Sequence, residues 1–190
     1  MAACEAWAKL GNIPQKSLEN IQKKASFRVE RIEEIENITR HDVIAFVSCV
    51  AEFIGDDARF VHMGLTSSDV LDTAYALQCK EAGEIIIEDI KALMEALKKR
   101  AYEYKDLPAM GRSHGIHAEP ISFGSKFALW YAEMERNLKR MADAVDVISY
   151  GKISGAVGTF ANVPPEIEEY VCKKLGIKAC LLYTSPSPRD

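Results

Sequence analysis

The chain has 190 residues, of which 48% are hydrophobic, and its 24 basic and 28 acidic side chains give a net charge of −4. This length allows one sizeable core and is marginal for two domains. The acidic balance argues against a general nucleic-acid binder, which normally carries a basic excess. No stretch approaches the roughly 20 apolar residues that span a bilayer, and the N-terminus lacks the pattern of a signal peptide. We expect a globular protein that binds neither nucleic acid nor membrane, with a small anionic ligand still open.

Five cysteines are scattered along the chain without a CxxC pair or a regular spacing: Cys4, Cys49, Cys79, Cys172 and Cys180. An odd, irregular set without a secretion signal is typical of reduced, buried thiols in the cytosol rather than of disulfides or a metal site. We therefore predict a cytoplasmic protein.

Helical periodicity runs through the first part of the chain. Met1–Leu10 and Ser17–Ala25 are predicted as short helices, and Arg28–Glu36 as a charged amphipathic helix. His41–Ile54 is more apolar, which predicts a core helix that ends at Gly55.

Two longer segments determine the predicted fold. From Ser68 to about Tyr104 the chain has no proline and one glycine, and from Ser122 to about Tyr150 apolar residues recur in steps of three and four. This period is that of a long helix packed against other long helices. We see no alternating strand pattern there. Two such helices cannot bury their apolar seams against each other alone, so we expect a bundle with further members. The seam of the second segment consists of Phe123, Phe127, Trp130, Met134, Leu138, Met141, Val145 and Ile148.

The first polar cluster is Thr39–Asp42. Arg40 offers a planar fork of donors for phosphate or carboxylate, and His41 can change its charge near neutral pH. Asp42 can orient either neighbour or a ligand hydroxyl. The same residues also fit a plain N-cap with an acidic first turn, and both interpretations stay open.

The second cluster, His62–Asp69, places three hydroxyls and a carboxylate at the start of a long helix. Free N–H groups and the positive dipole end make a helix N-terminus suitable for an anion. The alternative is a capping box with Asp69 in the first turn, which accounts for one hydroxyl but not for a histidine and three hydroxyls.

The third cluster is Gly111–Pro120. Glycines on either side of Ser113 and His114 let the backbone bring the imidazole close to a substrate. His114 and His117 are three residues apart, as in some zinc sites, but no third ligand follows at a sensible spacing, so we expect no metal. For either histidine alone, a hydrogen-bonded structural role is the alternative.

Taken together, these clusters resemble the first half of bacterial adenylosuccinate lyase, a branch of the fumarase/aspartase superfamily. The motifs that carry the resemblance are TRHDVIAF, VHMGLTSSDVLDTA, GRSHGIHAEP and GKISGAVGTFANVPP. The resemblance implies an all-α fold, with an N-terminal helical domain over residues 1–67 and the start of a central long-helix bundle over residues 68–179. It implies a homotetramer whose active sites draw on three subunits, and no cofactor. The resemblance also leads us to expect that the chain begins late and lacks the second half, which in that family carries the serine that acts as catalytic base.

The resemblance also implies roles for individual residues. His114 would be the general acid that protonates the departing nitrogen, and Ser113 stands where many members carry threonine. His62 would be an accessory residue beside the site. The substrate-binding residues that it implies are Arg40, His41, Asp42, Thr66, Ser67 and Ser113.

The implied reaction is the anti β-elimination of fumarate from adenylosuccinate to give AMP, and from SAICAR to give AICAR. Other superfamily activities, such as those of argininosuccinate lyase, aspartase or fumarase, share the helical core and the hydroxyl–imidazole theme. A non-catalytic helical assembly module is the alternative from another class. Such a module has no reason to concentrate His, Ser and Thr in its loops.

The composition changes abruptly after the helical segment Glu166–Leu175. The last eleven residues, CLLYTSPSPRD over 180–190, match the translation of a sequencing adapter. We therefore expect a non-native tail and exclude it from the fold prediction.

Overall fold

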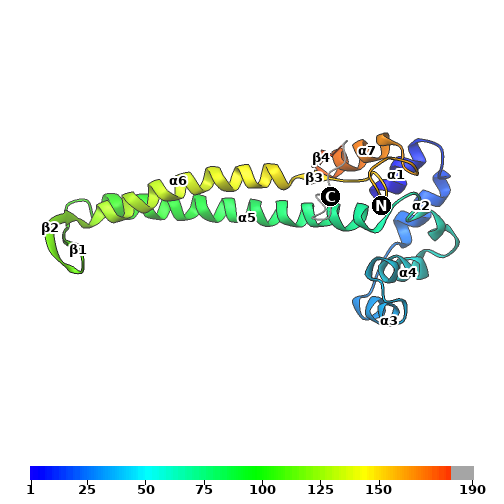
Figure 1. The fold of residues 1–190 in the computed structure, drawn as a ribbon, viewed down its shortest axis with the longest axis horizontal. Coiled ribbons are helices and arrows are strands. Elements are labelled where there is room, and N and C mark those ends of the chain that lie inside the picture. The colour runs from blue at the N-terminus through cyan, green and yellow to red at the C-terminus, as the bar shows by residue number, and fades with distance from the viewer. Residues whose placement is uncertain (181–190) are drawn as a thin grey trace. The chain divides into compact units, whose positions relative to one another are not determined.

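The computed structural model describes residues 1–180, so the prediction on the tail falls outside the described residues from 181 onward. The chain forms two compact units: unit 1 combines Met1–Leu77 with the residues from Ser149 onward, and unit 2 is Gln78–Ile148. Figure 1 shows the elements in chain order. The predicted domain boundary at residue 68 lies at the start of helix α5, Ser67–Glu103, whose first turns belong to unit 1 and whose remainder belongs to unit 2.

Unit 1 is mainly helical. Its first four helices agree with the predicted segments to within three residues at each end, and the predicted end of the fourth helix at Gly55 is confirmed, since Gly55 is its C-cap at φ +78°. Its elements other than α5 are α1 (Ala2–Lys9), α2 (Gln15–Lys24), α3 (Val29–Thr39), α4 (Asp42–Ile54), the 3₁₀ helix η1 (Gly55–Phe60), α7 (Pro165–Leu175) and a short parallel pair, β3 (Tyr150–Gly151) with β4 (Lys178–Ala179).

The core of unit 1 joins segments that are far apart in the sequence. Ile21 from α2, Ile54 from α4 and Ile167 from α7 are at most 2% exposed and belong to one cluster. Burying each such side chain contributes roughly 1.5–3 kcal/mol. The indole N–H of Trp7 donates to the carbonyl of Met63 at 3.0 Å, which ties α1 to the loop before α5.

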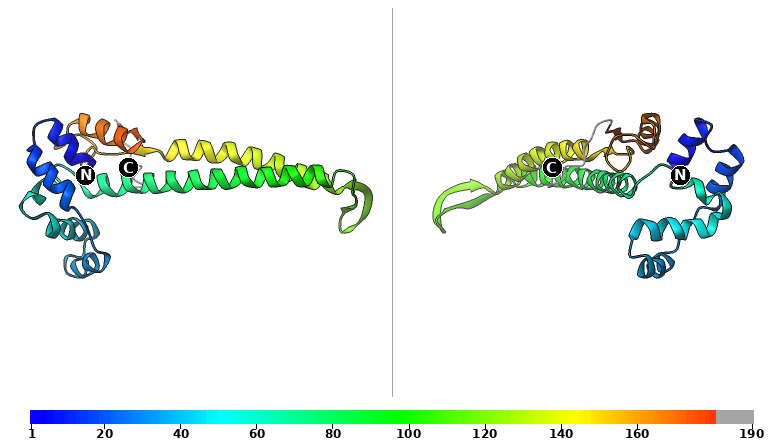
Figure 2. Two further views of the ribbon diagram at one scale, coloured as in Figure 1. Left: turned by 180° about the vertical axis from the view of Figure 1, so that it is seen from behind. Right: turned by 45° about the vertical axis from the view of Figure 1, so that its right-hand side comes forward.

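Unit 2 is a pair of long helices, the main part of α5 and α6 (Phe123–Ile148), which run side by side in Figure 1 and Figure 2. Gly83 permits their close approach, because a Cβ there would lie 2.4 Å from the Val145 side chain. The seam is only partly covered: within this unit Met94 and Leu97 are the buried hydrophobic residues, and Trp130 is 48% exposed. This agrees with the expectation that two helices alone cannot bury it.

A β-hairpin connects the two long helices, where the sequence showed us no strand pattern. β1 (Pro108–Ser113) pairs antiparallel with β2 (Ile116–Ser122). Most hairpin residues are exposed and none is buried, so no buried apolar face marks the two strands in the sequence. The all-α class is confirmed for the scaffold, and the two small sheets are additions to it.

All five cysteines are free, as predicted, and Cys4, Cys49 and Cys172 are buried. Burial raises the pKa of the Cys172 thiol to about 12, so it stays a neutral thiol. Among the described residues, no helix combines the length and apolarity that a membrane crossing requires.

Candidate functional site

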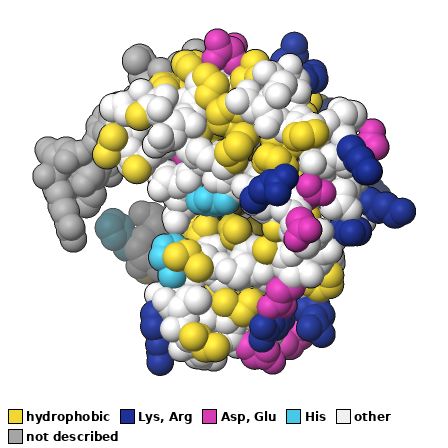
Figure 3. Space-filling model, turned by 90° about the vertical axis from the view of Figure 1, so that its right-hand side faces the viewer, with side chains coloured by type: hydrophobic (Ala, Val, Ile, Leu, Met, Phe, Trp, Pro, Cys, Tyr) yellow, Lys and Arg dark blue, Asp and Glu magenta, His cyan; other side chains and the backbone are white. Residues whose placement is uncertain are grey.

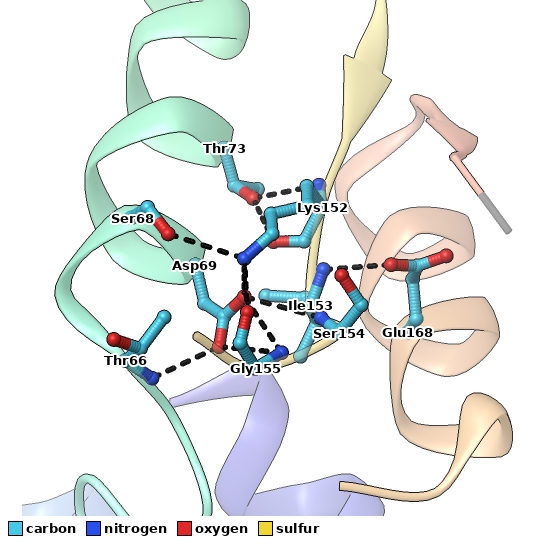
Figure 4. A network of polar contacts seen from close by, with 9 residues as sticks. All are labelled: Thr66, Ser68, Asp69, Thr73, Lys152, Ile153, Ser154, Gly155 and Glu168. Atoms are coloured by element: carbon cyan, nitrogen blue, oxygen red, sulfur yellow. Dashed lines mark hydrogen bonds and ion pairs between the residues drawn. The ribbon is translucent and has the colours of Figure 1, made fainter. Parts of the chain in front are cut away.

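Asp69 lies at the centre of a buried polar network at the start of α5. Its carboxylate is fully buried. One oxygen, Oδ1, accepts from the Lys152 ammonium at 2.8 Å and from the Ser154 backbone N–H at 3.1 Å. The other, Oδ2, accepts from the Thr66 N–H at 2.9 Å, and both oxygens lie 3.2 Å from the Gly155 nitrogen (Figure 4). A charge removed from water is tolerated only with such a full set of partners.

The capping interpretation of the second cluster is partly right. Asp69 is the third residue of α5 and binds the N–H of Thr66, the residue before the helix, as the acidic member of a capping box does. Because the Asp69 carboxylate performs this capping, the hydroxyls of Thr66 and Ser67 are not needed for it. Over residues 1–180, neither hydroxyl makes a hydrogen bond with a protein group. Both side chains are half-buried and remain available to a ligand.

The turn that holds His62 packs under the loop before α7. Gly64, at φ +74°, has no room for a side chain, since a Cβ would lie 2.4 Å from the carbonyl oxygen of Asn162. His62 Nε2 is buried and has no hydrogen-bond partner among the described residues. An orphaned buried polar atom of this kind calls for an explanation, and an absent ligand is one.

Arg40, His41 and Asp42 form the junction between α3 and α4. His41 is the N-cap of α4, and its Nδ1 accepts from the Ile44 N–H at 3.4 Å. The N-cap interpretation is therefore correct, and the cap is the imidazole of His41. Because Nδ1 accepts a hydrogen bond, the neutral ring carries its hydrogen on Nε2. Arg40 is exposed and adopts a left-handed backbone at φ +55°, which is uncommon for a residue with a side chain. Such strain is typical of functional sites.

Ser113 and His114 lie at the tip of the hairpin in unit 2. His114 and Gly115 form its two-residue turn, with φ of +50° and +80°. Positive φ at both central residues is the geometry of a type I′ turn. The Arg112 guanidinium donates to the Gly115 carbonyl at 3.3 Å. The His114 side chain is exposed. Glycine is needed at position 111, because Ala118 and Glu119 bulge opposite it and a Cβ would lie 2.4 Å from the Glu119 carbonyl oxygen.

The base of the hairpin is anchored by aromatic rings. The rings of Tyr104, Phe123 and Phe127 pack together with centroid separations of 5.2 to 5.9 Å, two pairs edge to face and Tyr104–Phe127 stacked. The Ser122 hydroxyl also donates to the Lys105 carbonyl at 2.6 Å. These contacts hold the base of the hairpin, while the Arg112 guanidinium and the pairing of Ser113 with Ile116 hold its tip beside His114.

The structure thus places the predicted residues in three groups. His62, Thr66 and Ser67 share one turn of unit 1, and Arg40–Asp42 form a second group in the same unit. Ser113 and His114 belong to unit 2. Figure 3 shows histidine side chains reaching the surface beside hydrophobic ones on the face that it draws.

The sequence interpretation missed Lys152 and took Asp69 only as a cap. Lys152 lies 83 residues from Asp69, so no local spacing connects them. The one signal in the sequence was Lys152 itself, the single charged residue of the glycine-rich segment 151–165. If its ammonium is buried, it requires a buried carboxylate as partner.

Three comparisons, with a family model, with a protein sequence and with solved structures, each find proteins that this chain resembles. A protein-family model described as "Lyase" matches residues 1–188. The adenylosuccinate lyase of Bacillus subtilis (strain 168) is 50% identical over 188 residues, which is 99% of this chain and 44% of that protein. The solved structure of a fumarate lyase from Mesorhizobium sp. BNC1 has a TM-score of 0.88 at 26% identity, covering 96% of this chain and 44% of that one. A β-carboxy-cis,cis-muconate cycloisomerase from Acinetobacter calcoaceticus sp. ADP1 has a TM-score of 0.89 at 28% identity, covering 98% and 46%. The chain spans less than half the length of these relatives.

Proposed function

The chain belongs to the lyase family whose model it matches over residues 1–188, and from that membership we propose that the full-length protein is an adenylosuccinate lyase. Its reaction is the elimination of fumarate from adenylosuccinate to give AMP, and from SAICAR to give AICAR. The observation that carries the proposal is the 50% identity to the Bacillus subtilis enzyme across 99% of the chain. Two solved relatives with other printed names are 26% and 28% identical to this chain.

The chemistry of the elimination matches the residues at hand. A weakly acidic C–H next to a carboxylate must lose its proton, so negative charge grows on that carboxylate in the transition state. Thr66 and Ser67 carry hydroxyls that have no partner among the described residues, at the N-terminus of α5, where the helix dipole also favours an anion. Donors aimed at developing charge are worth about 3 kcal/mol each in a dry site.

His114 supplies the other half of the reaction as general acid. The departing nitrogen must be protonated as the C–N bond breaks, and histidine is the side chain that most often donates a proton in enzymes. Its place at an exposed turn lets the ring reach a substrate bound elsewhere. Ser113, next to it, would help to hold the substrate. The elimination itself requires neither redox chemistry nor a metal.

Arg40, His41 and Asp42 hold the rest of the substrate in this proposal, and His62 is an accessory group. The left-handed Arg40 projects from the end of α3 with its guanidinium exposed, which suits the recognition of phosphate or carboxylate. The free Nε2 of His41 and the orphaned Nε2 of His62 offer two further polar contacts.

The proposed assembly is a homotetramer, active in the cytoplasm, in which neighbouring subunits and the remainder of the full-length chain cover the seams of α5 and α6. The exposed Trp130, Leu93 and Ile86 support a covered face, since a soluble monomer rarely leaves such a stripe in water. Light scattering and binding of an apolar dye test it on the chain itself. A compact monomer of 21.2 kDa that does not bind the dye would contradict the assembly.

The function is tested by expressing the full-length protein and following fumarate release from adenylosuccinate and from SAICAR. Argininosuccinate is the matched control, because it also releases fumarate but lacks the purine. We expect turnover of the first two and none of the third. Turnover of argininosuccinate alone would assign the protein to a sister activity. No fumarate from any of the three would favour the assembly module.

A further inference from the structure

The backbone of Lys152–Gly155 is held by side chains rather than by a sheet or helix. Thr73 Oγ1 accepts from the Lys152 N–H at 3.1 Å and donates to the Lys152 carbonyl at 3.0 Å. Glu168, fully buried on α7, accepts from the Ile153 N–H at 2.7 Å. Asp69 accepts from the next two N–H groups, as Figure 4 shows. Four consecutive residues are thus fixed against two helices.

The Lys152 ammonium is fully occupied within the protein. It donates to Asp69 Oδ1 at 2.8 Å, to Ser68 Oγ at 3.1 Å and to the Gly155 carbonyl. An ammonium has three donors, so none is left for a substrate. Its side chain is 11% exposed. Lys152 is therefore suited to fixing its neighbours and not to binding a ligand.

We propose that Asp69 and Lys152 are positioning residues, which lock the Thr66–Ser67 turn onto the Lys152–Gly155 segment and thereby aim the two hydroxyls at the substrate carboxylate. This inference rests on the proposed function. One Asp69 oxygen binds the Thr66 N–H and the other binds Lys152, so a single carboxylate connects the hydroxyl turn to the segment. The ammonium extends the connection to Ser68.

The hydroxyls depend on this connection because no other side chain among residues 1–180 bonds to them. Neither Thr66 Oγ1 nor Ser67 Oγ is bonded within the described part of the chain, so the backbone alone sets their direction. A shift of about 1 Å in a positioned group can cost about a hundredfold in rate. Removing one partner of a buried ion pair leaves an uncompensated charge, which forces such a shift.

The test is a double-mutant cycle between Asp69→Asn and Ser67→Ala in the full-length enzyme, with adenylosuccinate as substrate. We expect Asp69→Asn to lower kcat/KM about a hundredfold in the wild-type background. In the Ser67→Ala background the same change costs much less, because the hydroxyl that it misdirects is already gone. Equal factors in both backgrounds, within about twofold, would overturn the proposal while leaving the proposed function intact.

Glu168→Gln is the matched control for a purely structural role. Glu168 is also a fully buried carboxylate that binds the segment, through the Ile153 N–H, but it lies on α7 and not in the first turn of α5. It should lower the unfolding temperature without coupling to Ser67→Ala in kcat/KM. Coupling as strong as that of Asp69 would show a general loss of packing and overturn the assignment.

A milder pair of variants keeps the proposal testable if Asp69→Asn does not fold. Thr73→Val removes both hydrogen bonds to the Lys152 backbone at nearly constant volume, and Thr73→Ser keeps them. We expect Thr73→Val to lower kcat/KM about tenfold and Thr73→Ser to restore it to within about twofold. Unchanged kinetics in Thr73→Val would contradict the proposal. A wild-type enzyme that releases no fumarate would instead remove the proposed function, and this inference with it.

Discussion

Unit 1 and unit 2 differ in how completely each buries its own apolar side chains. In unit 1, Ile21, Ile54 and Ile167 are at most 2% exposed, and a buried carboxylate is fully paired. In unit 2, the most buried hydrophobic residues, Met94 and Leu97, are still 9% exposed. Unit 1 has a core of its own, whereas the apolar faces of unit 2 remain largely exposed in this chain.

Their ion pairs differ in the same way. In unit 1, Glu5 on α1 pairs with Lys174 on α7, and Arg31 on α3 pairs with Glu52 on α4. In unit 2, the pairs Lys80–Glu84, Lys91–Glu88 and Arg100–Glu103 each lie within one helix. The two ion pairs of unit 1 thus join different helices, whereas each of these three pairs in unit 2 connects residues of α5 alone. Stability and chemistry should therefore respond differently to substitutions in the two units.

The largest effect is expected at the hairpin tip of unit 2, where a substitution should lower the reaction rate without changing the stability of the fold. His114→Asn keeps a residue that favours the left-handed turn before Gly115, so the hairpin should persist. Loss of a general acid typically lowers kcat by 10² to 10⁴-fold. We expect a fall of at least about a hundredfold in the full-length enzyme, with an unchanged unfolding temperature. Near-normal turnover at pH 7 would show that the proton comes from another group, His41 being the next candidate.

A second test compares one substitution in both units. Ile21→Ala removes a fully buried side chain of unit 1 and should cost about 2–5 kcal/mol of unfolding free energy. Ile86→Ala in unit 2 removes a side chain that is 42% exposed in the chain itself. Denaturant unfolding of the isolated chain should show a cost below about 1 kcal/mol for Ile86→Ala.

The same Ile86→Ala variant in the full-length protein sharpens the comparison. If additional protein covers this face, the cost should rise toward that of Ile21→Ala, because the side chain is then buried. An equally small cost in both contexts would mean that the face stays in water and that the contrast between the units is intrinsic.

The third prediction concerns Arg40 of unit 1, whose backbone is strained although the unit has a well-packed core. The left-handed backbone at φ +55° costs about 1 kcal/mol for a residue with a side chain. Arg40→Gly should relieve that strain at the end of α3, where glycine is the usual residue, and raise stability by up to about 1 kcal/mol. The same change should raise KM about tenfold, because the guanidinium is lost. Arg40→Ala is the control that loses the charge and keeps the strain.

The helices were predictable because apolar residues recur at the helical period. The positions of Gly55 and of the seam from Phe123 to Ile148 depend on local spacing, which the sequence shows directly. The hairpin left no such pattern, because neither of its faces is buried. The pair His114–Gly115 was its one local signal, as a two-residue turn with a glycine in second place.

The candidate site was predictable where a motif carried it and not where long-range contacts did. Thr66, Ser67 and His114 were named from motifs, and their roles stay predictions. Asp69 and Lys152 form a pair only because the fold brings the start of α5 against the Lys152–Gly155 segment. The two residues are 83 positions apart, so no local pattern in the sequence connects them. Likewise, the sequence suggested an N-cap at Thr39–Asp42, but only the structure shows that His41 provides it.

The smallest expected effect is the response of unit 1 to acid through Glu5. This carboxylate accepts from the Lys174 ammonium, from Gln22 at 3.0 Å and from the Tyr170 hydroxyl at 3.2 Å, so it joins α1, α2 and α7. The hydrogen bond from Lys174 lowers the pKa of the Glu5 carboxyl. A carboxyl with a lowered folded-state pKa stabilises the fold above its unfolded pKa, and that contribution is lost as the pH falls through the folded pKa.

Unfolding free energies of the wild type and of Glu5→Gln should therefore differ at pH 7 and converge below about pH 4. We expect a difference of no more than about 1 kcal/mol, because water screens the partly exposed pair. Glu88→Gln in unit 2 is the matched control, since Glu88 pairs with Lys91 on the same helix and is 71% exposed. It should show almost no pH-dependent difference. Equal responses of the two variants would mean that the tie between α1 and α7 adds nothing beyond a surface ion pair, and the contrast between the units would then rest on apolar packing alone.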